Sequence, residues 1–219
     1  ERRIELTPFL EWCCGVSPAP RREFHKLFIA TWFDRARGAV FARNHMWDVG
    51  SPRYGHWNTD FPYVAALMST EPVALAQGDK SEFLGRYGTP RAPVALGDRE
   101  WRAQFGRHED PVAALRTAIV LPAGRRRVLG FALAVSSAPD ATAALLDSYA
   151  RPEAYDEALA EARQAWWTRL AAQRVETPDP TVDLLLNDWL RYQAISARLW
   201  GRCGYYQQSG AYGFRDQLQ

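Results

Sequence analysis

The sequence predicts a mixed fold in which an antiparallel β-sandwich comes first and helices follow. Up to about residue 137, short apolar or alternating runs are interrupted by proline, glycine and aspartate, as is typical of sandwiches. After Ser136 and Ser137, alanine, glutamate, leucine and arginine predominate, and the apolar spacing changes from two residues to about 3.6. We therefore expect a partial β-sandwich at residues 1–137, a helical linker at 138–176 and the truncated start of a further helical domain at 177–219.

Two hairpins are predicted within the sandwich. The β-rich runs at residues 27–33 and 39–43 flank a polar loop that ends in Gly38, the residue type that such turns need. Residues 118–121 and 127–135 flank Pro122-Ala123-Gly124 in the same manner. Further strands are expected at residues 63–68 and 73–76.

Two helices are expected in the linker. The first begins at Pro139-Asp140 and continues to about Tyr149. The second restarts at Arg151-Pro152, with proline in the first turn, where it is tolerated. Its apolar face carries Tyr155, Leu159, Ala162, Trp166 and Leu170.

A third helical segment begins at residues 177–180 and is predicted to end near Gly201. Its apolar stripe comprises Leu185, Trp189, Tyr192, Ile195 and Leu199. Its polar stripe comprises Asp183, Asn187, Arg191 and Arg198. One buried and one polar face suit either a surface helix or a helix that lines the inside of a helical barrel.

Composition excludes several classes of partner. With 219 residues, of which 47% are hydrophobic, the chain can bury a core. A net charge of +2 leaves no electrostatic footprint for nucleic acid. No apolar run approaches the ~18 residues of a membrane span, so we expect no membrane contact by this piece. Both ends look cut, because residues 3–7 read as a strand entered midway and the last residues lack a capping element, so we expect a fragment.

Cysteine and histidine patterns indicate neither a disulfide framework nor a metal site. Cys13 and Cys14 are adjacent, which disfavours a bond between them, and the odd total of three suggests reduced, mostly buried thiols. We therefore expect a reducing, cytoplasmic location. The four histidines are scattered without the spacing of metal ligands, so no metal is expected.

The last fifteen residues carry the sharpest chemical signal. Residues 205–219 contain three tyrosines, four glutamines and the adjacent pair Arg215-Asp216. A sugar site needs forked donors and acceptors for neighbouring hydroxyl groups together with an aromatic surface, and this segment supplies both. The alternative is a polar turn that caps the helix, in which Arg215 and Asp216 only form salt bridges.

The run Gly-Ala-Tyr-Gly-Phe-Arg-Asp-Gln-Leu-Gln at residues 210–219 resembles the motif with which glycoside hydrolase family 94 begins the active-site wall of its (α/α)6 barrel. Residues 186–200 resemble the first helix of that barrel. Residues 26–29, 41–43, 57–60 and 82–88 resemble its N-terminal β-sandwich, in the same order. The resemblance therefore covers nearly the whole chain, and its final residues are more similar to the members associated with β-1,2-glucans and to cellodextrin phosphorylases than to cellobiose phosphorylases.

The resemblance implies that Arg215 and Asp216 hold the glucosyl unit on the non-reducing side of the bond to be broken. Tyr206, Gln207 and Gln219 are further substrate-binding candidates because they are near in sequence. Adjacent residues on an extended segment point to opposite sides, so one residue of the Arg-Asp pair binds sugar while the other orients it. The family's general acid lies in a Trp-Asn-Asp motif that we expect beyond Gln219, so no catalytic residue is assigned in this chain.

The implied reaction is inverting phosphorolysis, in which inorganic phosphate cleaves a β-glucan, favoured as β-1,2-linked, to give α-glucose 1-phosphate. Expected partners are a β-gluco-oligosaccharide, phosphate as co-substrate, the remainder of the barrel and a second copy in a homodimer, with no cofactor. The piece alone should be inactive, and its parent would be membrane-anchored if it were a cyclic glucan synthase. The alternative is a noncatalytic carbohydrate-binding β-sandwich with a helical extension.

Overall fold

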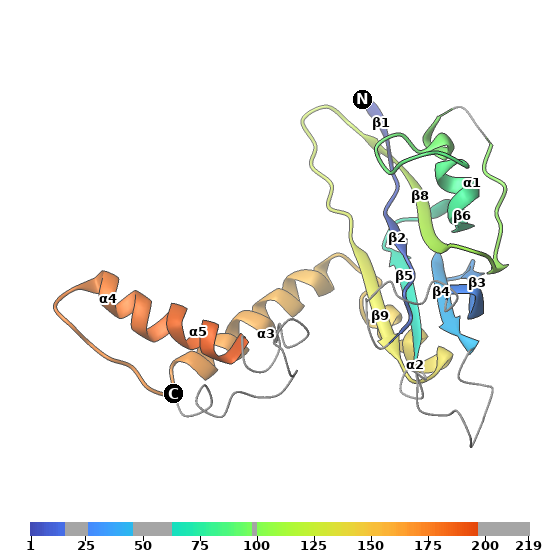
Figure 1. The fold of residues 1–219 in the computed structure, drawn as a ribbon. Helices are drawn as coiled ribbons and strands as arrows, with labels where there is room; N and C mark the ends of the chain where they lie inside the picture. Colours follow the sequence, from blue (N-terminus) through green and yellow to red (C-terminus); the bar gives the residue numbers. More distant parts are fainter. Residues whose placement is uncertain (16–25, 46–62, 98–99, 197–219) are drawn as a thin grey trace, which may run out of the picture. The chain divides into compact units, whose positions relative to one another are not determined.

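The computed structural model describes residues 1–15, 26–45, 63–97 and 100–196. The chain divides into two compact units, Glu1–Asp156 and Glu157–Gln219, each of which is described by itself. Figure 1 shows that the first unit contains all the described strands, whereas the second is helical in its described part.

The first sheet is built around one long strand, β8 (Pro111–Leu121). Two shorter strands, β1 (Arg2–Leu6) and β2 (Phe9–Glu11), pair in succession along one edge of β8. The opposite edge pairs with β6 (Val73–Asp79), which is irregular at two points of the register. All these pairings are antiparallel.

The second sheet has five antiparallel strands in the order β7-β3-β4-β5-β9. Their bounds are β3 Ile29–Asp34, β4 Ala39–Asn44, β5 Val64–Ser69, β7 Gly106–Arg107 and β9 Phe131–Ser136. The predicted hairpin is confirmed, because β3 pairs with β4 from Ile29 opposite Asn44 to Asp34 opposite Ala39. Gly38 in its turn has a φ of 62°, a conformation that favours glycine.

The second predicted hairpin is wrong, because β8 and β9 belong to different sheets. The turn after Leu121 does form, and the Arg125 amide donates to the Pro122 carbonyl at 3.2 Å. The chain then crosses to the other sheet without strand structure, so β9 begins only at Phe131. Within this crossing, the Arg127 Nε and Nη2 atoms lie 3.1 and 2.6 Å from the two carboxylate oxygens of Glu71.

Apolar side chains fill three layers around the two sheets. Between the sheets, Trp12, Ile29, Leu67 and Leu115 belong to one buried cluster. On the outer face of the first sheet, the short helix α1 (Lys80–Leu84) contributes Phe83, which stacks on Phe9 with ring centroids 4.9 Å apart. A 3-10 turn, η3 (Val94–Leu96), completes that layer. The third layer lies on the outer face of the second sheet, where α2 (Pro139–Ser148) contributes Leu146.

Helices follow the sheets as predicted. After α2 comes α3 (Glu153–Leu170), then α4 (Pro180–Leu184), a π-helical turn η4 (Leu185–Trp189) and α5 (Leu190–Ile195). The fold class, antiparallel sheets followed by helices, is therefore confirmed, and the described residues contain no closed barrel. The predicted domain limits at residues 137 and 177 stay predictions.

The two adjacent cysteines differ in burial. Neither thiol forms a disulfide, and Cys14 is buried whereas Cys13 is exposed. Burial, together with the neighbouring Cys13, raises the pKa of Cys14 to about 12. Within the described part of the chain, no helix is long and apolar enough to cross a membrane.

Candidate functional site

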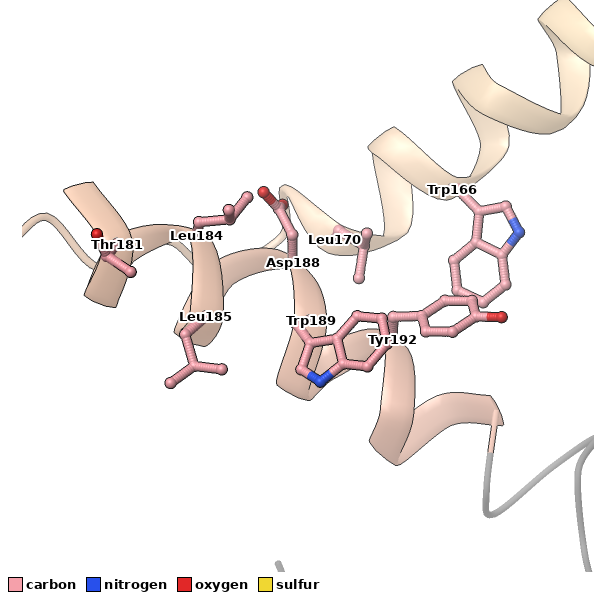
Figure 2. A pocket seen from close by; sticks show the side chains of 8 residues that line it. All are labelled: Trp166, Leu170, Thr181, Leu184, Leu185, Asp188, Trp189 and Tyr192. Atoms are coloured by element: carbon pink, nitrogen blue, oxygen red, sulfur yellow. The ribbon is translucent and has the colours of Figure 1, made fainter.

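The second unit contains an apolar cleft with a volume of about 560 Å³ (Figure 2). It lies between the end of α3 and the α4–η4–α5 segment, and its walls are Trp166, Leu170, Leu184, Leu185, Trp189 and Tyr192. Thr181 and Asp188 are the polar residues of its lining. The cleft is therefore lined by residues of two helical segments, which the sequence predicted as separate elements.

Aromatic rings dominate one end of this cleft. Tyr192 lies between the two indoles in Figure 2, with ring centroids 5.0 Å from Trp166 and 6.3 Å from Trp189. Trp189 remains 55% exposed and Leu184 62% exposed. A sugar site needs several converging donors and acceptors, which this lining lacks, so the cleft suits apolar side chains instead.

The polar stripe of the same helical segment hydrogen-bonds to the backbone of residues 170–177, which precede that segment. Asn187 is buried and makes a reciprocal pair with Val175, because its Nδ2 donates to the carbonyl and its Oδ1 accepts from the amide, both at 2.8 Å. Asp183 accepts from the Thr177 amide at 2.8 Å. Arg191 donates to the Leu170 carbonyl at 2.7 Å. These three side chains fix residues 170–177 against the helix.

Sequence reasoning found this stripe but missed its role. We expected Asp183, Asn187 and Arg191 to form a polar face toward solvent or toward the inside of a barrel, and instead they bond to backbone groups of the preceding segment. The available signal was their i, i+4, i+8 spacing directly after a proline-containing connection, where unpaired amides need partners. Arg198, the fourth member, lies outside the described residues.

Local sequence explains how the segment begins and where it changes pitch. Asp179 caps α4, since its carboxylate accepts from the Thr181 amide at 2.8 Å, and Pro180 occupies the first helical turn. The predicted continuous α-helix contains a π turn at Leu185–Trp189, which includes the buried Asn187. Such turns are rare and are often found at functional sites.

The five predicted substrate-binding residues, Arg215, Asp216, Gln219, Tyr206 and Gln207, all lie outside the described residues. They follow α5 in the sequence, and their assignment to a sugar site stays a prediction. The Trp57-Asn58-Thr59-Asp60 run, which resembles part of the family's N-terminal β-sandwich, also lies outside the described part.

Charged groups of the first unit gather where β6 meets α1. His108 Nδ1 lies 3.2 Å from Asp79 Oδ2, while the other oxygen of Asp79 caps α1 by accepting from the Ser81 amide at 2.6 Å. Lys80 Nζ lies 2.9 Å from Glu11 Oε1 and thereby connects α1 to β2. Each pair joins one element to the next, so this cluster is structural. No group of three or more histidine, cysteine, aspartate or glutamate side chains in the described ranges could hold a metal ion.

Comparison with known families covers both units. The model of the glycosyl hydrolase 94 supersandwich domain matches residues 1–152. The model of the glycosyl hydrolase 94 superfamily catalytic domain matches residues 165–219. The chain belongs to glycosyl hydrolase family 94. The resemblance that we identified from short motifs is thereby confirmed.

Relatives within family 94 are much longer than this chain. Cyclic β-(1,2)-glucan synthase NdvB of Rhizobium meliloti (strain 1021) is 31% identical over the whole chain, which spans 7% of its length. The N,N'-diacetylchitobiose phosphorylases of Vibrio furnissii and Vibrio proteolyticus are 26% and 24% identical over 75% of the chain, which corresponds to 21% of each relative.

The family 94 matches assign the two architectural parts to different domains of the family. The sandwich and α2 fall within the supersandwich match, whereas the cleft-lining residues from Trp166 onward fall within the catalytic-domain match. The segment with Arg215 and Asp216 also falls within the catalytic-domain match. The described cleft and the predicted sugar-binding segment are thus parts of one domain of the family.

Proposed function

We propose that the protein to which this chain belongs is an inverting glycoside phosphorylase or glucosyltransferase that acts on β-linked glucans. The observation that carries this proposal is the ordered match of both family 94 domains along one chain. Two of the similar relatives are named as phosphorylases and a third as a glucan synthase. All three names describe enzymes that transfer a glycosyl group.

The proposed chemistry needs one protein acid and one external nucleophile. A carboxylic acid protonates the glycosidic oxygen while phosphate attacks the anomeric carbon from the opposite face, which inverts the configuration there. Phosphate is already an anion, so no second carboxylate is needed as a base. We assign the acid to sequence outside residues 1–219 and assign to Arg215 and Asp216 the binding and orientation of the glucosyl unit.

For the substrate, we propose a β-1,2-linked glucan. The relative named for β-(1,2)-glucan synthesis is similar over the whole chain, whereas the chitobiose phosphorylases are similar over 75% of it and at lower identity. The final residues Asp216-Gln217-Leu218-Gln219 also resemble the β-1,2-glucan members and cellodextrin phosphorylases more than cellobiose phosphorylases. The apolar cleft supports a scaffolding role for the described helices, because its lining offers sugars few polar partners.

A linkage panel tests this proposal. The complete protein is incubated with β-1,2-, β-1,3- and β-1,4-linked gluco-oligosaccharides and with N,N'-diacetylchitobiose, each with and without inorganic phosphate, and sugar 1-phosphate release is measured. We expect phosphate-dependent release from the β-1,2-linked series. Release from diacetylchitobiose alone would overturn the substrate assignment. Binding without release from any sugar would overturn the proposed activity in favour of a noncatalytic carbohydrate-binding role.

A further inference from the structure

Tyr155, in the first turn of α3, belongs to the outer layer of the second sheet. Its side chain packs against the buried cluster that includes Met68, Ala132 and Leu146, and its ring centroid lies 6.1 Å from that of Tyr149. Its hydroxyl oxygen is buried and has no hydrogen-bond partner in the described part of the chain. Burial accordingly raises the pKa of Tyr155 above its ordinary value. Because no bond holds the hydroxyl group, packing positions this ring.

The Tyr155 ring fills the space in which residue 130 would otherwise carry a side chain. A Cβ atom on Gly130 would lie 2.5 Å from Cζ and 2.9 Å from the hydroxyl oxygen of Tyr155, well inside the 3.5–4.0 Å at which carbon atoms attract each other. Thr70 holds Gly130 in place, because the Gly130 amide donates to Thr70 Oγ1 and the Thr70 amide donates to the Gly130 carbonyl, each at 3.0 Å. We call this fixed space above Gly130 the Gly130 seat.

The residue in the Gly130 seat lies between the two family 94 matches. The supersandwich match ends at residue 152 and the catalytic-domain match begins at residue 165, so Tyr155 falls in the short interval between them. The helix α3 spans this interval without a break. Trp166, which lines the cleft, follows Tyr155 by about 16 Å along the helix axis. A continuous helix transmits a displacement of its first turn to its later turns.

We propose that Tyr155 is a positioning residue for the glycosyl transfer proposed above, because the Gly130 seat fixes the first turn of the helix that leads into the catalytic domain. Tyr155 acts through α3 and is assigned no contact with substrate. A misplacement of about 1 Å at a reacting centre can lower the rate about 100-fold, so a distant anchor can affect turnover. The effect on activity rests on the proposed function, whereas the order of the first turn can be measured without it.

Two substitutions empty or fill the Gly130 seat, and two more serve as matched controls. Tyr155→Ala removes the ring, and Gly130→Ala occupies the space that the ring needs. Tyr155→Phe keeps the ring and removes only the unpaired hydroxyl group. Gly97→Ala also adds a methyl group, but its Cβ would lie 3.5 Å from the Val94 carbonyl oxygen, an ordinary contact distance, and its φ of −80° suits alanine.

Hydrogen exchange of the complete protein, followed by mass spectrometry, measures the order of the first turn. The amides of Ala154 and Tyr155 donate to the carbonyls of Arg151 and Pro152, each at 3.1 Å. Tyr155→Ala and Gly130→Ala should speed exchange of these two amides at least ~10-fold, while peptides from β5 keep the wild-type exchange and thereby show that the sandwich is folded. Both controls should leave exchange unchanged at every site.

Phosphate-dependent release of sugar 1-phosphate tests the positioning role. We expect kcat/KM to fall about 10- to 100-fold in Tyr155→Ala and Gly130→Ala and to stay at the wild-type value in both controls. The double variant Gly130→Ala/Tyr155→Ala should be no less active than Tyr155→Ala alone, because the added methyl group then has no ring to displace. A wild-type protein without such release would refute the proposed function, whereas faster exchange in Tyr155→Ala would still support the Gly130 seat.

Three results would overturn the inference. The first is wild-type exchange in the first turn of α3 after Tyr155→Ala, and the second is wild-type turnover in that variant despite faster exchange. The third is a double variant in which the losses from Gly130→Ala and Tyr155→Ala add, because independent losses would mean that Gly130 does not act through the ring.

Discussion

Gln77 is predicted to be the most costly polar side chain to remove from the sandwich. It is 1% exposed, and its Oε1 accepts from the Asp79 and Gln104 amides, each at 3.1 Å. Its Nε2 donates to the Arg102 carbonyl at 2.6 Å. A third amide, of Gly78, also donates to Oε1, but it has a second acceptor in the Gln104 carbonyl at 2.9 Å. Gln77 thus holds residues 102–104 onto β6.

The substitution Gln77→Leu keeps the approximate volume and removes every one of these bonds. Four backbone groups lose their bond to Gln77, and the Gly78 amide keeps its second acceptor. Each of the other three that is left buried and unsatisfied costs about 1–3 kcal/mol. Allowing for partial relaxation, we expect the free energy of unfolding to fall by about 3–5 kcal/mol. The measurement is urea denaturation monitored by circular dichroism at fixed protein concentration, with the midpoint and slope compared between the two proteins.

The matched control is Gln164→Leu on α3. That glutamine is exposed, and its amide makes a single long contact of 3.4 Å to Thr168. Surface substitutions of this kind usually change the free energy of unfolding by no more than about 0.5 kcal/mol. A Gln77→Leu protein that lost less than about 1 kcal/mol, or no more than the control, would refute the assignment of Gln77 as the organiser of this region.

Three further predictions concern the helical unit, the thiols and the sugar site. Asn187→Ala should lower the stability of the second unit by about 2 kcal/mol through loss of its reciprocal bonds to Val175, seen as faster exchange of the Val175 amide; unchanged exchange would contradict it. The pKa of Cys14 is raised from 9.0 to about 12, so the folding stability that the buried neutral thiol contributes is present below pH 9 and is lost as pH rises toward 12. Cys14→Ala should flatten this decline in stability, measured by denaturation curves at several pH values. An equally steep decline in the variant would count against burial of Cys14 as its cause. In the complete enzyme, Arg215→Ala should remove about 2–4 kcal/mol of transition-state stabilisation, which lowers kcat/KM roughly 30- to 1000-fold. Near-normal turnover would exclude the proposed role.

The sequence was sufficient for the fold class but not for the connections between strands. The runs that became β3 and β4 flank a glycine turn and do form a hairpin. The runs that became β8 and β9 flank a similar turn and do not, because β8 pairs with β1, β2 and β6 whereas β9 pairs with β5 in the other sheet. Short-range patterns are alike in both cases, and only contacts between residues distant in sequence distinguish them.

The helical segment shows the same limit at the level of side chains. Periodicity placed Leu185, Trp189 and Tyr192 on one face, and all three do line the cleft. It also placed Asn187 on a polar face, where the structure has it buried against Val175. An asparagine that hydrogen-bonds to solvent and one that hydrogen-bonds to a buried backbone group have the same sequence pattern. The sugar-binding roles of Arg215 and Asp216 came from motif resemblance and stay predictions.

The anomeric configuration of the product tests the central claim most directly. The complete protein is incubated with a β-1,2-linked gluco-oligosaccharide and inorganic phosphate, and the sugar phosphate formed first is followed by NMR. An inverting phosphorylase predicts α-glucose 1-phosphate, formed only when phosphate is present. Formation of the β anomer, or release of free glucose at an equal rate without phosphate, would contradict the proposed reaction.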